Sequence, residues 1–186
     1  MKHLPLISKD ETDPECRKRW EGIGFDLAIF HVWAHDPDAF MAYSAFNGTV
    51  WRDQEDGFPL PLKEMAVVQA SVLSNSSYEW GNHGVQMINR GGTQEQLDAL
   101  VAGKPDADVF DETEKLVLKF ATEVTVDARP SEETLTAMGE KFTHKQIVQL
   151  VFAICAYMLN SRFANLGGCE KGDDEDFGMF SLGRKT

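Results

Sequence analysis

One short segment, from Ser74 to His83, gathers side chains that are suited to proton transfer. It reads Ser-Asn-Ser-Ser-Tyr-Glu-Trp-Gly-Asn-His. Asn75 or Ser76 is a typical N-cap residue, so we expect a helix to begin there. Glu79 and His83 are four residues apart and therefore share one face of that helix, with Ser76 one turn earlier.

These residue types allow acid–base chemistry. A histidine beside a carboxylate can be held in one tautomer and can titrate near neutral pH. A second carboxylate in an apolar setting has its pKa raised and can act as an acid. Glu64 opens the preceding apolar helix, and it would approach His83 if the two helices form a hairpin. Tyr78 and Trp80 are predicted to wall a pocket for a flat, unsaturated ligand.

Two other interpretations of this segment stay open. A Glu–His pair with this spacing on an exposed helix commonly does nothing more than decorate its surface. A metal site would need a third ligand besides Glu79 and His83, such as His31 or His35, which are also four residues apart. Packed or surface histidines are the simpler explanation, and we predict no metal and no cofactor. The sequence has no HExxH, GxGxxG or P-loop pattern, so no zincin or nucleotide site is indicated.

Helix start and stop signals recur along the rest of the chain. Asp36-Pro37 combines a cap residue with proline at the first helical position. Thr93 and Thr143 each precede a glutamine by three residues, which is the spacing of a capping box. The run Met65–Leu73 is apolar nearly all round and favours a buried helix, with a buried strand as the alternative.

The sequence therefore predicts an all-α fold of about eight helices. The expected helical ranges are roughly 14–22, 25–35, 37–54, 62–74, 76–90, 93–101, 111–127, 131–140 and 143–165.

Length and charge limit the classes of protein that fit. The chain has 186 residues and carries 18 Lys and Arg against 30 Asp and Glu, a formal net charge of −12. We expect one domain over residues 1–186, with its core at about 25–166. The negative charge disfavours nucleic acid and anionic membranes as partners. No membrane span or signal peptide is indicated, so a cytoplasmic protein is expected.

Three cysteines, Cys16, Cys155 and Cys169, are widely spaced and odd in number. This pattern is typical of free thiols in a reducing compartment. Cys155 lies in an apolar run, and we expect it to be a buried structural thiol.

The C-terminal tail, residues 167–186, is acidic. Its run Glu170–Asp176 is predicted to be a solvated, poorly ordered end. The alternative is a lid or a subunit contact formed by Phe177, Met179 and Phe180.

Several segments in the same order resemble the carboxymuconolactone decarboxylase and alkylhydroperoxidase-D-like superfamily. They are Leu60–Glu64, Tyr78–His83, Gly91–Leu97, Glu114–Ala121 and Gln146–Arg162, and the similarity covers about residues 25–166. The resemblance implies an all-α fold that assembles as a homo-oligomer, from dimer to hexamer, with an active site near subunit contacts.

The peroxidase branch of this superfamily has a glutamate, then a CxxC motif at a helix start, then a histidine four residues after the second cysteine. On this sequence the glutamate falls on Glu64 and the histidine on His83, but the cysteines fall on Ser76 and Glu79. Because a hydroxyl and a carboxyl cannot form a disulfide, thiol peroxidase activity is not expected.

The decarboxylase branch looks closer, and it implies a cofactor-free reaction on a small lactone acid or unsaturated acid. His83 would then donate or accept the proton, Glu79 would orient it or share the proton, and Glu64 would be the second acid–base group. Ser76 and nearby amides would hold substrate oxygens. The same residues would serve an isomerase or another lyase. An antioxidant relative and a non-catalytic oligomeric binding protein of the same fold are the alternatives.

Overall fold

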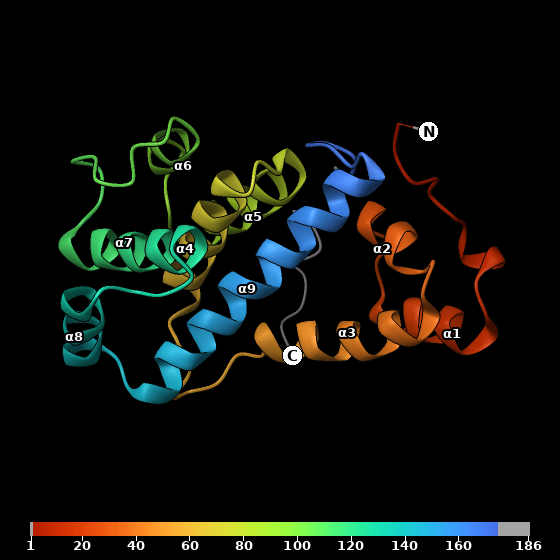
Figure 1. The fold of residues 1–186 in the computed structure, drawn as a ribbon, viewed down its shortest axis with the longest axis horizontal. Coiled ribbons are helices and arrows are strands. Elements are labelled where there is room, and N and C mark those ends of the chain that lie inside the picture. The colour runs from red at the N-terminus through yellow and green to blue at the C-terminus, as the bar shows by residue number, and fades with distance from the viewer. Residues whose placement is uncertain (1, 175–186) are drawn as a thin grey trace.

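The computed structural model describes residues 2–174, and this part of the chain is all-helical, with no strand (Figure 1). Its helices are α1 (Pro14–Ile23), α2 (Ala28–Trp33), α3 (Pro37–Val50), α4 (Leu60–Leu73), α5 (Ser77–Asn89), α6 (Gln94–Val101), α7 (Glu112–Val126), α8 (Glu132–Lys141) and α9 (His144–Gly167), preceded by a 3₁₀ turn at Lys9–Glu11. The all-α prediction is confirmed, and the nine α-helices over these residues correspond one to one to the nine predicted ranges.

The largest differences from the predicted ranges are at α2 and α3. Gly24 ends α1 in the left-handed conformation, with φ 85°, and Leu27 is an extended N-cap, so α2 begins at Ala28 and not at residue 25. Helix α3 ends at Val50, four residues earlier than predicted. The residues after it form the loop that brings Trp51 to the pocket described below.

Helix α9 runs diagonally through the molecule, with α1–α3 on one side and α6–α8 on the other (Figure 1). It packs against α4 and α5 and also contacts α2, α3, α7 and α8. Every residue of α4 from Lys63 to Ser71 is buried, which explains its lack of a polar face. By length and composition alone α9 could span a membrane, and 44% of its most apolar window is buried within the protein.

The outer face of α9 carries an exposed apolar stripe. Val148, Phe152, Leu159 and Leu166 are each at least 40% exposed and, at 100° per residue, lie on one face of the helix. Cys155 lies on the same face and is exposed. The prediction that Cys155 is buried is therefore wrong, because a helix that is apolar nearly all round does not reveal which face meets the core.

A three-residue connection folds α4 and α5 into a hairpin. Asn75 adopts a left-handed conformation, with φ 54°, and Ser76 caps α5 by accepting a hydrogen bond from the Glu79 backbone N–H at 3.4 Å. Cβ-bearing residues other than Asn and Asp adopt such a φ rarely. The hairpin places Glu64, near the start of α4, beside the middle of α5, as the sequence suggested.

The acidic segment after α9 is anchored where the structure describes it. One carboxylate oxygen of Asp174 accepts a hydrogen bond from the Ala28 backbone N–H at 2.9 Å, and the other accepts from the Tyr78 hydroxyl and from Asn82 Nδ2. The prediction of a solvated end is thus wrong for Asp174, which ties the start of α2 to α5. Phe177, Met179 and Phe180 lie outside the described residues.

Candidate active site

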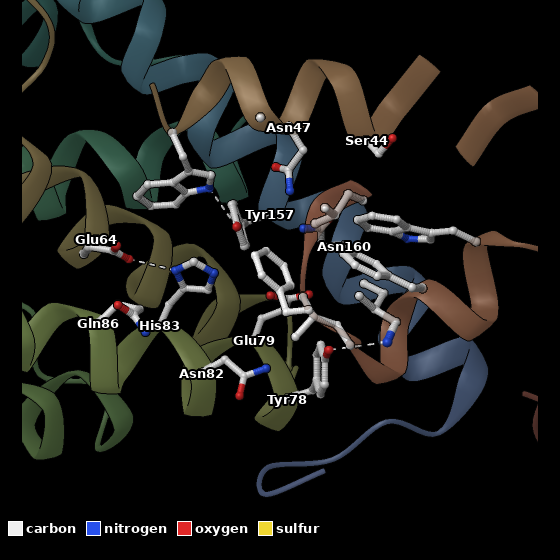
Figure 2. A pocket seen from close by; sticks show the side chains of 18 of the residues that line it. Ser44, Asn47, Glu64, Tyr78, Glu79, Asn82, His83, Gln86, Tyr157 and Asn160 are labelled. Atoms are coloured by element: carbon white, nitrogen blue, oxygen red, sulfur yellow. Dashed lines mark hydrogen bonds and ion pairs between the residues drawn. The ribbon is translucent and has the colours of Figure 1, made fainter. Parts of the chain in front are cut away.

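A cavity of about 650 Å³ lies between α1–α3 and the α4–α5–α9 core. Glu64, Tyr78, Glu79 and His83 all line it (Figure 2). The structure therefore brings together four of the six site residues predicted from the sequence. Their contributions come from the α4–α5 hairpin, and the opposite wall comes from the N-terminal helices.

Glu64 holds both a histidine and an arginine. Its Oε2 lies 2.7 Å from His83 Nδ1, and its Oε1 accepts a hydrogen bond from Arg90 Nε at 3.0 Å. Glu64 is 1% exposed and His83 5% exposed, so their contact is shielded from water, whereas the Arg90 side chain is 32% exposed. A carboxylate only accepts hydrogen bonds, so Nδ1 carries the proton in this pair. Ring geometry then directs Nε2 away from Glu64.

Two aromatic side chains fix the plane of the His83 ring. Trp51 stacks on it at 5.2 Å between ring centroids, and Tyr157 meets it edge-on at 4.3 Å. Trp51 Nε1 donates a hydrogen bond to the Tyr157 hydroxyl at 2.8 Å, which locks the two rings together. The buried Lys63 ammonium donates to the Val50 carbonyl at 3.0 Å, directly before Trp51, and so holds that loop in place.

Glu79, one turn before His83 on α5, lies in contrasting surroundings. It is 3% exposed, and its Oε1 has no hydrogen-bond partner among the described residues. Burial, with the negative charge of Asp174 as a second cause, raises the pKa of Glu79 to about 8. Glu79 is therefore mainly a neutral acid at pH 7, able to donate a hydrogen bond or a proton.

Three further polar atoms of pocket-lining residues are buried with no hydrogen-bond partner among residues 2–174. They are Trp33 Nε1, Asn47 Oδ1 and Gln86 Nε2. Leaving a buried polar atom without a partner costs roughly 1–3 kcal/mol, so such atoms are uncommon. Their concentration in one cavity is the pattern expected of a site that binds a polar ligand.

Four residues considered in the sequence analysis are not among the described residues that line this cavity. Ser76 uses its fully buried hydroxyl to cap α5, and Trp80 faces α6 and lies under the Lys171 ammonium, 4.7 Å from its ring centroid. His31 and His35 bond the backbone carbonyls of Ile7 and Pro5, each at 2.7 Å, and hold the N-terminal segment. Ser76 and Trp80, which were predicted to bind substrate, therefore do not line the cavity with Glu79 and His83.

The structure also adds residues that the sequence did not single out. Arg90, Trp51 and Tyr157 come from the end of α5, the loop after α3 and the middle of α9. Tyr157 stands in an apolar helix where a buried tyrosine hydroxyl needs a partner, which is a weak signal of a polar site. Nothing in the local sequence marks Arg90 or Trp51.

The three thiols do not resemble redox centres. Cys16 and Cys169 are buried and Cys155 is exposed on the outer face of α9, and none of them lines the cavity. Burial raises the pKa of all three, that of Cys169 to about 12, whereas a reactive thiolate needs a lowered pKa. Among the described residues, no group of three or more His, Cys, Asp or Glu is placed to hold a metal ion.

Comparisons with known proteins agree on the fold. The model of the Carboxymuconolactone decarboxylase family matches residues 37–123, from the start of α3 into α7. A solved structure described as an alkylhydroperoxidase AhpD core, an uncharacterized peroxidase-related protein from Ralstonia eutropha JMP134, is 23% identical, with a TM-score of 0.78, over 95% of this chain and 94% of that chain. A peroxidase-related protein from Silicibacter sp. TM1040 is 18% identical, with a TM-score of 0.73, over 90% of each chain.

A third solved structure is the debrominase Bmp8 in complex with 2,3,4-tribromopyrrole. It is 15% identical, with a TM-score of 0.68, over 98% of this chain and 97% of that chain. The comparison with curated proteins gives no match. At these identities the solved structures establish the fold and leave the chemistry to the site itself.

Proposed function

Because the chain belongs to the carboxymuconolactone decarboxylase and alkylhydroperoxidase-D-like superfamily, we propose that it is a cofactor-free acid–base enzyme for a small unsaturated carboxylic acid or lactone. The observation that carries this proposal is the pair of carboxyl groups in opposite states in one cavity. Glu64 is ion-paired and binds His83, whereas Glu79 is protonated at neutral pH. Two titratable groups with diverging states are the usual arrangement of an acid and a base in one site.

His83 is the proposed base. With its proton on Nδ1 held by Glu64, neutral imidazole carries its lone pair on Nε2. When Nε2 takes a proton from the substrate, Glu64 stabilises the imidazolium without having to move. The stacked Trp51 and the edge-on Tyr157 keep the ring in one orientation during this transfer. Positioned proton transfer of this kind contributes roughly 10²–10⁴-fold to a rate.

Glu79 is the proposed acid. In a decarboxylation, the bond between the substrate carbon and its carboxylate breaks, and the electron pair moves into a conjugated carbonyl as CO₂ leaves. The Glu79 O–H stabilises the developing enolate oxygen, and a proton from Glu79 or from the His83 imidazolium then bonds to carbon. One proton taken up from water restores the site. A buried neutral acid suits this step because it adds no negative charge beside an anion.

The same groups support a lactone or enol isomerisation, in which His83 moves a proton between two carbons and Glu79 binds the enolate oxygen. A thiol peroxidase step is not proposed, because the cavity has no cysteine among its described residues. The burial of Glu79 and His83 also argues against a fold that keeps its shape but has lost its chemistry.

The test is CO₂ release from γ-carboxymuconolactone by the purified protein. His83→Ala and Glu79→Gln are compared with His144→Ala and Glu95→Gln, which change the same residue types at exposed positions. We expect both pocket variants to lose turnover by about 10²-fold or more while the controls retain it.

Turnover that survives in both pocket variants would contradict the roles of His83 and Glu79. Absence of turnover in the wild type would exclude this substrate, and proton exchange at the α-carbon of unsaturated acids, measured in D₂O by NMR, would then test the isomerase form of the proposal.

A further inference from the structure

The end of the cavity remote from His83 is built by the N-terminal helices. Arg19 comes from α1, Trp33 from α2, and Ser44 and Asn47 from α3, and all four line the cavity. Figure 2 shows Ser44 on one side of the pocket and Glu64 on the other, so the cavity is longer than the acid–base site alone. Helices α1 and α2 precede the segment that matches the family model, which begins at residue 37.

Arg19 is poised at this remote end. Its Nε donates a hydrogen bond to the Ser44 hydroxyl at 2.9 Å, and that hydroxyl donates in turn to the Met41 carbonyl at 3.2 Å. This chain of hydrogen bonds fixes the guanidinium plane at one edge. Of the two cavity-lining arginines, Arg90 is paired with Glu64.

Arg19, in contrast, forms no ion pair with any residue of the described chain, although the protein has a net charge of −12. No described residue accepts a hydrogen bond from its terminal nitrogens either. A half-buried guanidinium with two free terminal nitrogens matches a carboxylate, which it binds through two parallel hydrogen bonds.

The space between Arg19 and His83 is suited to a flat, weakly polar body. Phe30, Trp33, Trp51 and Tyr157 supply aromatic walls. Two of the lining residues also carry buried polar atoms that have no partner among residues 2–174, the donor Trp33 Nε1 and the acceptor Asn47 Oδ1.

We propose that Arg19 binds the carboxylate of an aromatic or conjugated ring acid whose reacting carbon lies at the opposite end of the cavity, beside His83. This inference rests on the proposed function, since it names the class of substrate for that site. Arg19 would bind a carboxylate that remains on the product, and His83 and Glu79 would act on the reacting carbon at the other end of the ligand. In a decarboxylation, the carboxylate that leaves is therefore not the one that Arg19 neutralises.

Ligand binding tests this proposal without turnover. The wild-type protein is titrated with cinnamate and with cinnamamide, its uncharged counterpart of nearly the same shape, by isothermal titration calorimetry. We expect cinnamate to bind about 10- to 100-fold more tightly than cinnamamide, since hydrogen bonds to charged groups are worth this much. Equal affinities, or no saturation by cinnamate at millimolar concentration, would overturn the proposal.

The variants locate the effect. Arg19→Gln should abolish the preference for cinnamate and Arg19→Lys should keep only part of it, whereas Lys18→Gln, which removes the same charge from an exposed neighbour on α1, should preserve it. A full preference in Arg19→Gln, with unchanged thermal unfolding, would sink the proposal. His83→Ala should also retain the preference, so failure of the catalytic roles and failure of the carboxylate site give different results.

Discussion

Two carboxyl groups that line the cavity, those of Glu64 and Glu79, lie in opposite chemical surroundings. Around Glu64 every charge is matched, because Arg90 and His83 occupy its two oxygens. Around Glu79 little is matched, since among residues 2–174 its Oε1 has no partner and the one charge that affects its pKa is the like charge of Asp174. The groups around Glu64 are therefore organised before substrate binds, whereas Glu79 gains a hydrogen-bond partner only when substrate is present.

This difference explains why the protein tolerates two acidic groups in one enclosed space. A second charged carboxyl beside Glu64 would add repulsion in a region of low dielectric constant. Keeping Glu79 neutral avoids that repulsion and at the same time produces an acid. The stability of the folded protein and its proposed acid catalysis therefore both depend on the protonation of Glu79. Substitutions of Glu64 and Glu79 test this dependence.

The largest effect is expected for Glu64→Gln. The change leaves Arg90 without a counter-ion and removes the charge that stabilises the His83 imidazolium, so we expect turnover to fall by roughly 10²–10³-fold. The free energy of unfolding should fall by about 2–3 kcal/mol, because one partner of a buried ion pair is lost while Arg90 keeps some access to water. Steady-state kinetics and urea unfolding measure the two losses.

The double variant Glu64→Gln with Arg90→Gln separates those losses. It should recover much of the stability but none of the activity, because the unpaired charge is gone while His83 still lacks its carboxylate. Glu112→Gln, which breaks an exposed pair with Lys115, is the control and should change neither quantity. Full activity in Glu64→Gln would show that the pair serves packing alone.

The next effect is on the pH dependence of stability in Glu79→Gln. The native pKa of Glu79, about 8, is above its ordinary value of 4.5, so the native state binds the proton more tightly than the unfolded state. The stability from this proton is present below pH 4.5 and is lost as the pH rises through 8. Between pH 5 and pH 9 the wild type should therefore lose on the order of 4 kcal/mol that the variant does not lose.

Urea unfolding at pH 5, 7 and 9 measures this slope for both proteins. Glu95→Gln, at an exposed position near the start of α6, is the matched control and should keep the wild-type slope. Parallel slopes in wild type and Glu79→Gln would mean that Glu79 is ionised in the folded protein, and the contrast between the two carboxyl groups would then be lost.

A smaller effect is expected for Asp174→Asn. Burial is the main cause of the raised pKa of Glu79 and the charge of Asp174 is the second, so removing that charge should lower the pKa of Glu79 only in part and leave it above its ordinary value. The fall in the pKa of Glu79 is followed by ¹³C NMR titration of its carboxyl and, with a substrate, by a downward shift of the alkaline limb of the pH–rate profile. Asp173→Asn removes the same charge one residue away and should leave Glu79 unchanged.

Most of the fold could be predicted from the sequence because its signals are local. Cap residues such as Thr93 and Thr143 bond backbone groups within their own first turn, so the sequence alone places those helix starts. The start of α2 could not be read in this way, since Leu27 supplies no side-chain cap and the helix N-terminus is instead satisfied by Asp174, 146 residues away.

The candidate site divides along the same line. Glu79 and His83 share one helix, and Glu64 follows once a hairpin is assumed, so spacing suggested all three. Trp80 was misplaced because it lies one residue, or 100°, away from Glu79 around the helix and so faces α6.

Trp51 and Tyr157 meet His83 only in the folded chain, since they come from a loop and from α9. No pattern in one segment marks such a meeting. The acid–base residues can therefore be predicted from the sequence, whereas the aromatic residues that hold His83 are found only in the folded structure.

The exposed apolar residues on the outer face of α9 give the last prediction, for which the smallest effect on turnover is expected. The stripe of Val148, Phe152, Leu159 and Leu166 is apolar and exposed, and we predict that a second copy of the chain covers it in a homo-oligomer. Leu159→Lys should lower the mass measured by light scattering and leave turnover within about twofold, since Leu159 does not line the cavity. Val126→Lys, at an isolated exposed site at the end of α7, should keep the wild-type mass.

Cys155 lies within the stripe and is exposed in the single chain, so its reaction with a maleimide should be slow in the assembled protein and fast in Leu159→Lys. Equal labelling rates of Cys155 in the two proteins, together with a monomeric wild type, would show that no second copy of the chain covers the apolar face of α9. That face would then differ from the cavity, whose unpaired polar groups are proposed to be satisfied by a ligand.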